Sequence, residues 1–441
     1  MTRDEAQALT KKILGYATVP EAAVSVRVTR SGFLRFARNQ ATTAGQTESA
    51  SVDFTAWKGK RGASVQGTVE VLGDRLDETA LKKIVADAEA LAAISPEDRE
   101  YMPLPGPQKY LEVDAFDEAV ASAGPKMRAE RAGDAIQYAK DNKIEAAGFL
   151  DQRLSYHALA NTNELFAYHP STSIQFSMTA RTSDQTGSGY ASVQSQSYTS
   201  LDVREAAAMA VRKAVASRRP AETRPDAYPA VLEPLAVDDL LVYFGGDLDA
   251  RSADEGRSVF SAPEGKTRVG EQVFDERLTI RSDPADALVP ASPIGPEGFP
   301  VGKSGFVEKG VLKTLRNSRW WAAQKERQPG PFANNLIFEG GQKSLNEIIR
   351  STKKGVLVSR CWYIRMLDRQ QSSVTGLTRD GTFWIEDGEI ARPIKNFRFN
   401  ESMVRVLGDL EELGQPVRIG RGLIPPVRAR SFRFSSISDA V

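Results

Sequence analysis

Alternating hydrophobic and polar residues recur through the first 200 residues of the chain. Val24, Val26 and Val28 alternate with polar residues, and similar patterns occur at 33–38 and 51–69. Successive side chains of a β-strand point to opposite faces, so this spacing predicts strands with one buried face. A turn is predicted at Ser31-Gly32, and a hairpin joins 51–57 to 62–69. Three more strands are predicted at 144–159, 165–182 and 189–197, all rich in Ser, Thr and aromatic residues.

Apolar residues spaced by three or four predict helices between these strands. Thr2 followed by Glu5 is typical of a capping box, and it opens a helix whose apolar residues include Leu9 and Ile13. Further helices are predicted at 76–94, 114–123, 125–142 and 202–217.

The pattern changes after a charged, proline-rich stretch at 218–225. Beyond it strands and turns predominate, with predicted corners at Lys309-Gly310, Asp380-Gly381 and Asp387-Gly388. Short helices are predicted at 318–327, 344–351 and 401–410. The sequence therefore predicts an α+β fold of two domains, 1–217 and 228–441, with mixed helices and antiparallel sheets and a strand-rich C-terminal domain.

Charge and composition exclude several kinds of partner. The 441 residues carry 58 Lys plus Arg and 57 Asp plus Glu, a formal charge of +1. This balance gives no electrostatic reason to bind nucleic acid or an anionic membrane. A single cysteine fits a reducing compartment, and neither a signal peptide nor an apolar run long enough to span a bilayer is evident. We therefore expect a cytoplasmic protein.

Only two histidines are present, which disfavours zinc and histidine chemistry because zinc hydrolases commonly use two or three. His157 and His169 lie in predicted strands, and we interpret both as hydrogen-bonded or surface residues. A further hypothesis is a serine hydrolase in which one of these histidines acts with Ser188 or another serine. Cys361 lies in a strand-like stretch without a neighbouring histidine, so we expect a small buried side chain.

Three further patterns are interpreted as structural. The stretch 298–304 resembles a P-loop, but Glu297 occupies a required glycine position and the residues that follow predict a hairpin. The arginines near the C-terminus alternate with apolar residues as in a half-exposed strand; they are Arg428, Arg430 and Arg433. A group of acids brackets one helix-like segment without the spacing of a calcium loop, which favours a solvated helix face and loop. Its members are Asp238, Asp239, Asp247, Asp249, Asp254 and Glu255.

Many stretches together resemble the TldD/PmbA family, in which PmbA is also called TldE and whose members were once described as modulators of DNA gyrase. The most specific run is Trp362-Tyr-Ile-Arg-Met, Thr375-Gly-Leu-Thr-Arg-Asp-Gly381, Ile385-Glu-Asp-Gly-Glu389 and Pro393-Ile-Lys-Asn-Phe-Arg-Phe-Asn400. Earlier matches are at 162–173, 186–190, 231–234, 254–258, 270–274 and 306–312. The resemblance covers nearly the whole chain in the family's order.

The resemblance implies a zinc peptidase fold whose metal motif is missing here. In TldD-type subunits a His-Glu-x-x-x-His motif follows two leucines, and a cysteine near the C-terminus is a further ligand. Aligned on Leu240-Leu241, the motif positions are occupied by Val242, Tyr243 and Asp247, and 414–424 holds no cysteine. We therefore expect no catalytic residue, no metal ligand and no cofactor in this chain, with zinc supplied by a TldD-like partner.

The resemblance thus predicts a metal-free TldE/PmbA-type subunit of a cytoplasmic TldD/TldE-like metallopeptidase complex, which helps to bind and process unfolded peptides. The expected partners are a TldD-like zinc subunit or a second copy of the chain, together with peptide substrates. Four residues in matching stretches are candidates for a peptide groove: Gly187, Gly189, Thr378 and Arg379. The alternative is a homo-oligomeric binding or assembly module without peptidase activity.

Overall fold

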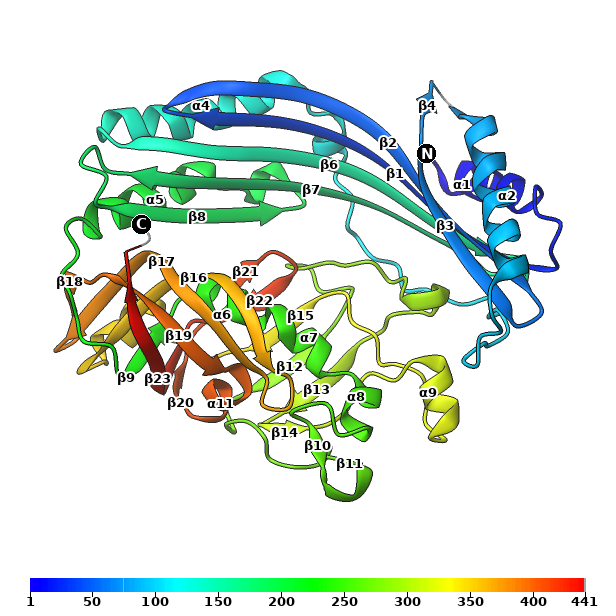
Figure 1. Cartoon of the computed structure of the whole chain (residues 1–441). Coiled ribbons are helices and arrows are strands. Elements are labelled where there is room, and N and C mark those ends of the chain that lie inside the picture. Colours follow the sequence, from blue (N-terminus) through cyan, green and yellow to red (C-terminus); the bar gives the residue numbers. More distant parts are fainter. Residues whose placement is uncertain (74, 440–441) are drawn as a thin grey trace.

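Six long strands from the N-terminal half form one curved antiparallel sheet (Figure 1) in the computed structural model, which describes residues 1–73 and 75–439. The predicted C-terminal domain ends at 440–441, outside the described residues. The strand order in the sheet is β3-β2-β1-β6-β7-β8. The strands are β1 (Glu21–Ala37), β2 (Gln40–Lys58), β3 (Arg61–Val69), β6 (Glu145–Asn161), β7 (Phe166–Arg181) and β8 (Ser188–Ser195). A small hairpin of β4 (Val71–Leu72) and β5 (Arg75–Leu76) follows β3.

Helices cover one face of this sheet. They are α1 (Arg3–Leu14), α2 (Glu78–Ile94), α3 (Glu118–Ser122), α4 (Pro125–Asp141) and α5 (Val203–Ala216). Val24 and Val26 pack with Leu81 and Val85 of α2 in one core, and α4 and α5 cover a second core further along the same strands. The capping box predicted at Thr2 is present at the start of α1.

The opposite face of the sheet is polar because the strands alternate. The residues between the buried valines of β1 point away from the helices. The residues paired with them on the adjacent antiparallel strands point to the same side. Along β1, β6, β7 and β8 these positions hold Ser25, Arg27, Thr29, Ser155, His157, His169, Ser171, Gln175, Ser192 and Gln194. This polar face is turned toward the C-terminal half of the chain (Figure 1).

Five strands of the C-terminal half close into a barrel. Each is paired with the next around the ring β16-β9-β23-β19-β17, and β17 pairs again with β16. The ring strands are β9 (Ala227–Leu232), β16 (Lys354–Asp368), β17 (Ser373–Glu386), β19 (Asn396–Ser402) and β23 (Val427–Ser438). Phe397, Phe399, Phe432 and Phe434 are buried in its core, which explains why these strands read as aromatic at alternate positions. Two strands pair outside the ring, β18 (Glu389–Pro393) with β17 and β20 (Leu410–Leu413) with β23.

A second sheet stands beside the barrel in the order β14-β13-β12-β15-β22-β21. Its strands are β12 (Thr279–Ser282), β13 (Ser304–Glu308), β14 (Val311–Leu312), β15 (Leu336–Glu339), β21 (Val417–Ile419) and β22 (Gly422–Ile424). A short hairpin of β10 (Ser261–Ala262) and β11 (Lys266–Thr267) extends from this half. The helices are α6 (Pro234–Leu240), α7 (Phe244–Asp247), α8 (Ala250–Asp254), α9 (Arg319–Gln324), α10 (Leu345–Arg350) and α11 (Met403–Gly408).

The predicted class is confirmed: helices and mostly antiparallel sheets are mixed, and the C-terminal half is rich in strands. The pairings β9–β16 and β15–β22 are parallel. The last strand of the first sheet ends at Ser195, and the first barrel strand, β9, begins at Ala227. The division into domains 1–217 and 228–441 stays a prediction.

Two predicted turns are wrong. Ser31-Gly32 lies within the continuous strand β1, where Gly32 makes room for the Arg128 guanidinium; a Cβ there would lie 2.4 Å from Arg128 Nη1. Asp380-Gly381 is a bulge inside β17 rather than a corner, opposite a register shift between Val358 and Arg360 of β16. The corners at 309–310 and 387–388 are hairpin turns, as predicted.

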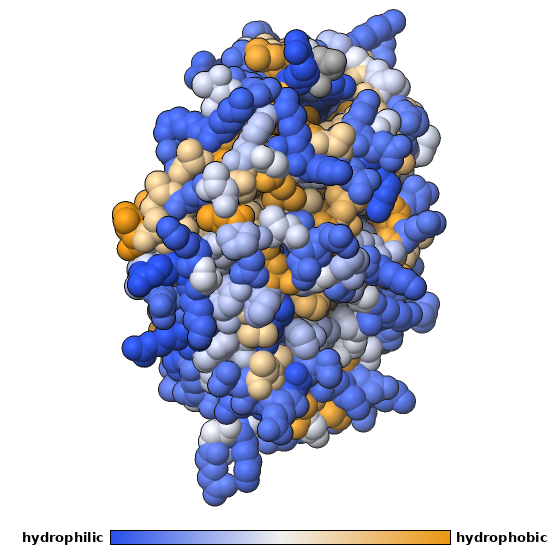
Figure 2. All heavy atoms as spheres, turned by 90° about the vertical axis from the view of Figure 1, so that its right-hand side faces the viewer, coloured by the Kyte–Doolittle hydropathy of each residue, from blue (hydrophilic) through white to orange (hydrophobic). Residues whose placement is uncertain are grey.

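The surface near α1, α2 and α9 is mainly hydrophilic, with hydrophobic residues in small groups (Figure 2). None of the helices in the described part of the chain is both long enough and apolar enough to cross a membrane.

Candidate functional site

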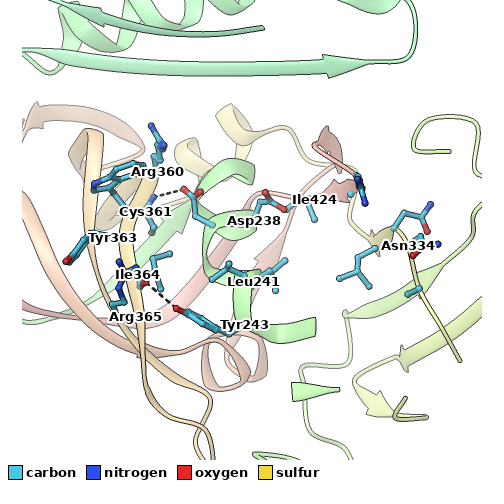
Figure 3. Close-up of a pocket in the computed structure, with 18 residues that line it drawn as sticks. Asp238, Leu241, Tyr243, Asn334, Arg360, Cys361, Tyr363, Ile364, Arg365 and Ile424 are labelled. Carbon is cyan, nitrogen blue, oxygen red and sulfur yellow. Dashed lines mark hydrogen bonds between the residues drawn. The ribbon is translucent and has the colours of Figure 1, made fainter. Parts of the chain in front are cut away.

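A cleft of about 780 Å³ lies in the C-terminal half. The end of α6 and the turn after it form the floor, β16 forms one wall, and segments next to β15 and β22 form the other (Figure 3). Its lining includes Asp238, Asp239, Val242, Tyr243, Asn334, Asn335, Arg360, Cys361, Trp362, Tyr363, Ile364, Arg365, Arg421 and Ile424.

Two adjacent carboxyl groups lie at the end of α6 where the cleft approaches the first sheet. Asp239 Oδ2 accepts a hydrogen bond of 2.9 Å from the backbone N–H of Cys361. Burial raises the pKa of Asp238 to about 6 and that of Asp239 to about 7, because a charged carboxylate is poorly solvated there. The prediction of a solvated helix face is therefore wrong for these two residues, and it is also wrong for Asp247 and Asp254, which are buried.

Arg360 connects the cleft to the first sheet. Its guanidinium carbon lies 4.0 Å from the ring centroid of Tyr190 on β8 and 5.0 Å from that of Trp362. Arg360 Nη1 is 3.2 Å from Asp380 Oδ2, and Asp380 Oδ1 accepts a hydrogen bond of 2.6 Å from Ser188 Oγ. The bulge at Asp380 thus places a buried carboxylate between the two halves of the chain.

A smaller cavity of about 170 Å³ lies between the polar face of the first sheet and the cleft. Asp238, Asp239 and Arg360 line both hollows, which makes the two adjacent. The other walls of this inner cavity are Gln175, Tyr190, Ser192, Gln194, Leu235, Arg418, Ile419 and Gly420.

The wall formed by β16 presents a strand edge to the cleft. β9 pairs with β16 only at residues 356–358, so the edge from Cys361 to Arg365 continues without it. Side chains occupy two backbone groups there: Asp239 accepts from Cys361, and the Tyr243 hydroxyl donates to the Ile364 carbonyl at 3.4 Å (Figure 3). Tyr363 has a φ of 53° between them, a conformation that interrupts the register with β17.

The positions that replace the zinc motif do not converge on one point. Val242 lines the cleft and is 63% exposed, and Tyr243 lies beside it. Asp247 is buried outside the cleft, where its carboxylate accepts a hydrogen bond of 2.5 Å from Ser372 Oγ and burial raises its pKa. Across residues 1–73 and 75–439, no three or more His, Cys, Asp or Glu side chains gather in a way that could hold a metal ion. This donor set does not fit the zinc site of the motif.

The four groove candidates are dispersed, and none of them lines the cleft. Gly187 and Gly189 pack against α5, where a Cβ would lie 2.2 Å from Ala214 O and 2.1 Å from Ala210 O respectively. Thr378 is buried in the barrel and accepts a hydrogen bond from the Phe397 backbone N–H. Arg379 borders the cleft through its contact with the ring of Trp362, 5.2 Å away.

The histidines and Ser188 lie far apart along the first sheet. His157 and His169 are directly opposite each other on β6 and β7, and His157 Nε2 is 3.0 Å from Ser25 Oγ. Burial lowers the pKa of each histidine to about 4, with Arg27 also lowering that of His157. Ser188 pairs with residue 181 of β7, twelve residues from His169 and therefore about 40 Å along the strand. This separation rules out Ser188 as the partner of either histidine.

The remaining candidates have structural roles. Cys361 is buried, as predicted, and burial raises its pKa. The P-loop-like stretch precedes the hairpin of β13 and β14, also as predicted. Asp249 caps α8, and Asp254 accepts hydrogen bonds from Trp321 and Arg327. Glu255 pairs with Arg251 and Arg257; Arg428, Arg430 and Arg433 lie in β23 and pair with Glu411, Asp409 and Glu401.

Among the residues of the site, only Asp238 and Asp239 have a signal in the sequence. They immediately precede Leu240-Leu241, on which the zinc motif is aligned. Arg360, Tyr190 and Arg418 carried no local signal, because they lie on β16, β8 and β21, which are separated in the sequence and meet only in the fold.

Comparison with known proteins gives two family matches. Residues 116–218 match the PmbA/TldA metallopeptidase central domain and residues 225–436 match the PmbA/TldA metallopeptidase C-terminal domain, which together cover more than half of the chain. A metalloprotease of Methanothermobacter thermautotrophicus is 27% identical over 171 residues. That match spans 35% of this chain and only 36% of the relative.

Three solved structures share the fold over nearly their whole length. A proposed DNA gyrase modulator of Bacteroides thetaiotaomicron has a TM-score of 0.85 at 17% identity, covering 99% of this chain and 100% of that one. TldE of Thermococcus kodakarensis has a TM-score of 0.82 at 18% identity, covering 97% and 99%. A proposed gyrase modulator of Thermotoga maritima has a TM-score of 0.80 at 19% identity, covering 98% and 99%.

Proposed function

Because the chain belongs to the PmbA/TldD family, we propose that it is a zinc-free, TldE/PmbA-type subunit of a cytoplasmic TldD/TldE-like metallopeptidase complex. In this role it helps to bind unfolded peptides, and a TldD-like partner supplies the zinc. The observation that carries the proposal is the exposed Val242 in the lining of the cleft, at the position where the motif has its first histidine. A valine side chain offers no donor atom to zinc.

The cleft supports the peptide-binding part of the proposal. Its volume of about 780 Å³ is within the usual range for ligand sites. β9 does not cover the edge of β16 at Cys361–Arg365, and an extended peptide can add to such an edge through main-chain hydrogen bonds. Binding there requires the peptide to replace the contacts that Asp239 and Tyr243 make with the strand. Exposed aromatic rings at Trp362 and Tyr363 supply apolar contacts for its side chains.

The titratable and nucleophilic side chains around the cleft support a role in peptide binding rather than in bond cleavage. Asp239 could accept a proton near neutral pH, but neither histidine lies in the cleft and Cys361 is a buried thiol. We therefore assign orientation of the peptide backbone to the β16 edge and cleavage to the zinc-bearing partner.

The test compares the chain alone with the chain and a family member that carries His-Glu-x-x-x-His. After dialysis the isolated chain should hold far less than one zinc per chain and leave an unfolded peptide intact. The mixture should co-purify and cleave the peptide, and a chelator should abolish this activity. Trp362→Ala should raise KM in the mixture, whereas Arg204→Gln on the exposed face of α5 serves as the matched control.

Three results would overturn the proposal. About one zinc per isolated chain would mean that ligands outside the aligned motif hold the metal. Cleavage by the isolated chain that resists chelator and is lost in His157→Ala or Ser25→Ala would instead establish a serine hydrolase. Failure to pair with any zinc-bearing relative, combined with self-association, would favour the homo-oligomeric binding module.

A further inference from the structure

The inner cavity presents charges of both signs to the same small space. Asp238 and Asp239 reach it from α6, Arg360 from β16 and Arg418 from β21. Uncharged amides and hydroxyls of the first sheet close the other side, namely Gln175, Gln194, Ser192 and Tyr190. Such a lining suits a ligand that is itself both cationic and anionic.

The acidic side of the cavity has no protein cation in direct contact, although Arg360 acts on Asp239 from a distance. No lysine or arginine nitrogen lies within 4.0 Å of a carboxylate oxygen of Asp238 or Asp239 in the described residues. Asp239 accepts a hydrogen bond from the Cys361 N–H with one oxygen, and the Asp238 carboxylate accepts none within the described residues. Ionised carboxylates only accept hydrogen bonds, and an ammonium group offers three donors.

The basic side is also incompletely neutralised. Arg418 donates to Gln196 and to the Leu288 carbonyl but forms no ion pair with an acid among the described residues, although it is largely buried. Arg360 is paired with Asp380, but its Nε atom is buried and has no hydrogen-bond partner. A carboxylate can accept from guanidinium groups in the fork geometry that arginine offers.

We infer that the inner cavity binds a small zwitterion, a free amino acid or a dipeptide, with its ammonium group at Asp238 and Asp239 and its carboxylate at Arg418 and Arg360. A cavity of about 170 Å³ has room for roughly six to eleven water-sized groups. Alanine has a size at the lower end of this range and alanylalanine at the upper end. The cleft adjoins this cavity, since three residues line both.

The raised pKa values of Asp238 and Asp239 give the site a pH dependence. Below about pH 6 both carboxyls are largely protonated and attract an ammonium group weakly; toward pH 8 both ionise. The charged groups facing them are Arg360 of β16, Asp380 of β17, and Arg418 and Arg421 around β21 and β22, and the arginines stay charged throughout. We therefore expect tighter binding at pH 7.5 than at pH 5.5.

Calorimetry with the intact chain tests the inference, which does not depend on the proposed peptidase role. The probes are L-alanine and L-alanyl-L-alanine, with N-acetylalanine and alaninamide as ligands that each lack one charge. One probe should bind at one site per chain, and each charge-deleted ligand should bind at least about tenfold more weakly. No saturable binding up to about 10 mM, or equal binding of N-acetylalanine, overturns the inference.

Variants locate the binding. Asp238→Asn should weaken alanine or dipeptide binding by about tenfold and leave only the part of the pH dependence that Asp239 contributes. Arg418→Gln should weaken binding by a similar factor. The matched controls are Asp134→Asn on α4 and Arg204→Gln on α5, which lie outside the cavity. Equal effects of test and control variants would place the ligand elsewhere and overturn the inference. The ligand series on the unmodified chain decides the question if a variant fails to fold.

Discussion

Asp239 illustrates how burial and one hydrogen bond set the chemistry of a single carboxyl group. The Cys361 N–H favours its charged form, yet burial outweighs this and the pKa rises to about 7. The folded chain therefore holds a proton that the unfolded chain releases near pH 4, so this residue makes the fold less stable as the pH rises from about 4 to 7.

We predict that Asp239→Asn becomes progressively more stable than the unmodified chain between pH 5 and pH 8. The gain should reach roughly 1–3 kcal/mol, a value reduced because the side chain is partly solvated. Urea unfolding at several pH values measures it, with Asp134→Asn as the exposed control. A stability difference that does not change with pH would show that Asp239 is ionised throughout this range.

The close contact of α5 with β8 and the residues just before it depends on two glycines, Gly187 before the strand and Gly189 within it. At Gly189 a Cβ would lie 2.1 Å from Ala210 O and 2.5 Å from Ala214 N, both backbone atoms of α5. Gly189→Ala must therefore push the helix off the strand, and we predict a loss of about 1–3 kcal/mol in the free energy of unfolding. Gly133→Ala is the control, because a Cβ there has open space on α4 and should stabilise the helix by about 0.5–1 kcal/mol. Equal stabilities of the two variants in urea would contradict the close packing of α5.

The first sheet and the C-terminal half are joined by buried polar contacts. Lys213 of α5 lies 2.6 Å from Glu233 after β9, with side chains only 15% and 10% exposed, and Ser359 also donates to Glu233. Arg418–Gln196 and Ser188–Asp380 cross the same boundary.

Lys213→Met should leave Glu233 buried without its cation and lower the free energy of unfolding by about 3–5 kcal/mol. Adding Glu233→Gln to the Lys213→Met variant should restore part of this loss, and Lys12→Met in the exposed pair with Glu78 should change stability little. Calorimetric unfolding measures all four proteins. A loss no larger than that of Lys12→Met would mean that water screens the Lys213–Glu233 pair in solution.

Local sequence determined the parts of this protein that depend on near neighbours. The alternation around Val24 and Val26, the capping residue Thr2 and the hairpin at Asp387-Gly388 act over a few residues, and the structure has each as predicted. The family resemblance, which extends over nearly the whole chain, is confirmed by the matches of the central and C-terminal domains.

The tertiary structure alone decided where polar groups meet. Gly32 and Asp380 were predicted in turns because their local chemistry favours turns, but the packing of Arg128 and the link to Ser188 keep both within strands. Asp238 and Asp239 were predicted to be solvated, because their local sequence contains no sign that β16 and the first sheet cover them. Desolvation depends on every element that surrounds a group, and the elements here come from residues 175–194, 235–239, 360 and 418–420. The inner cavity and its mixed charge therefore follow only from the folded chain.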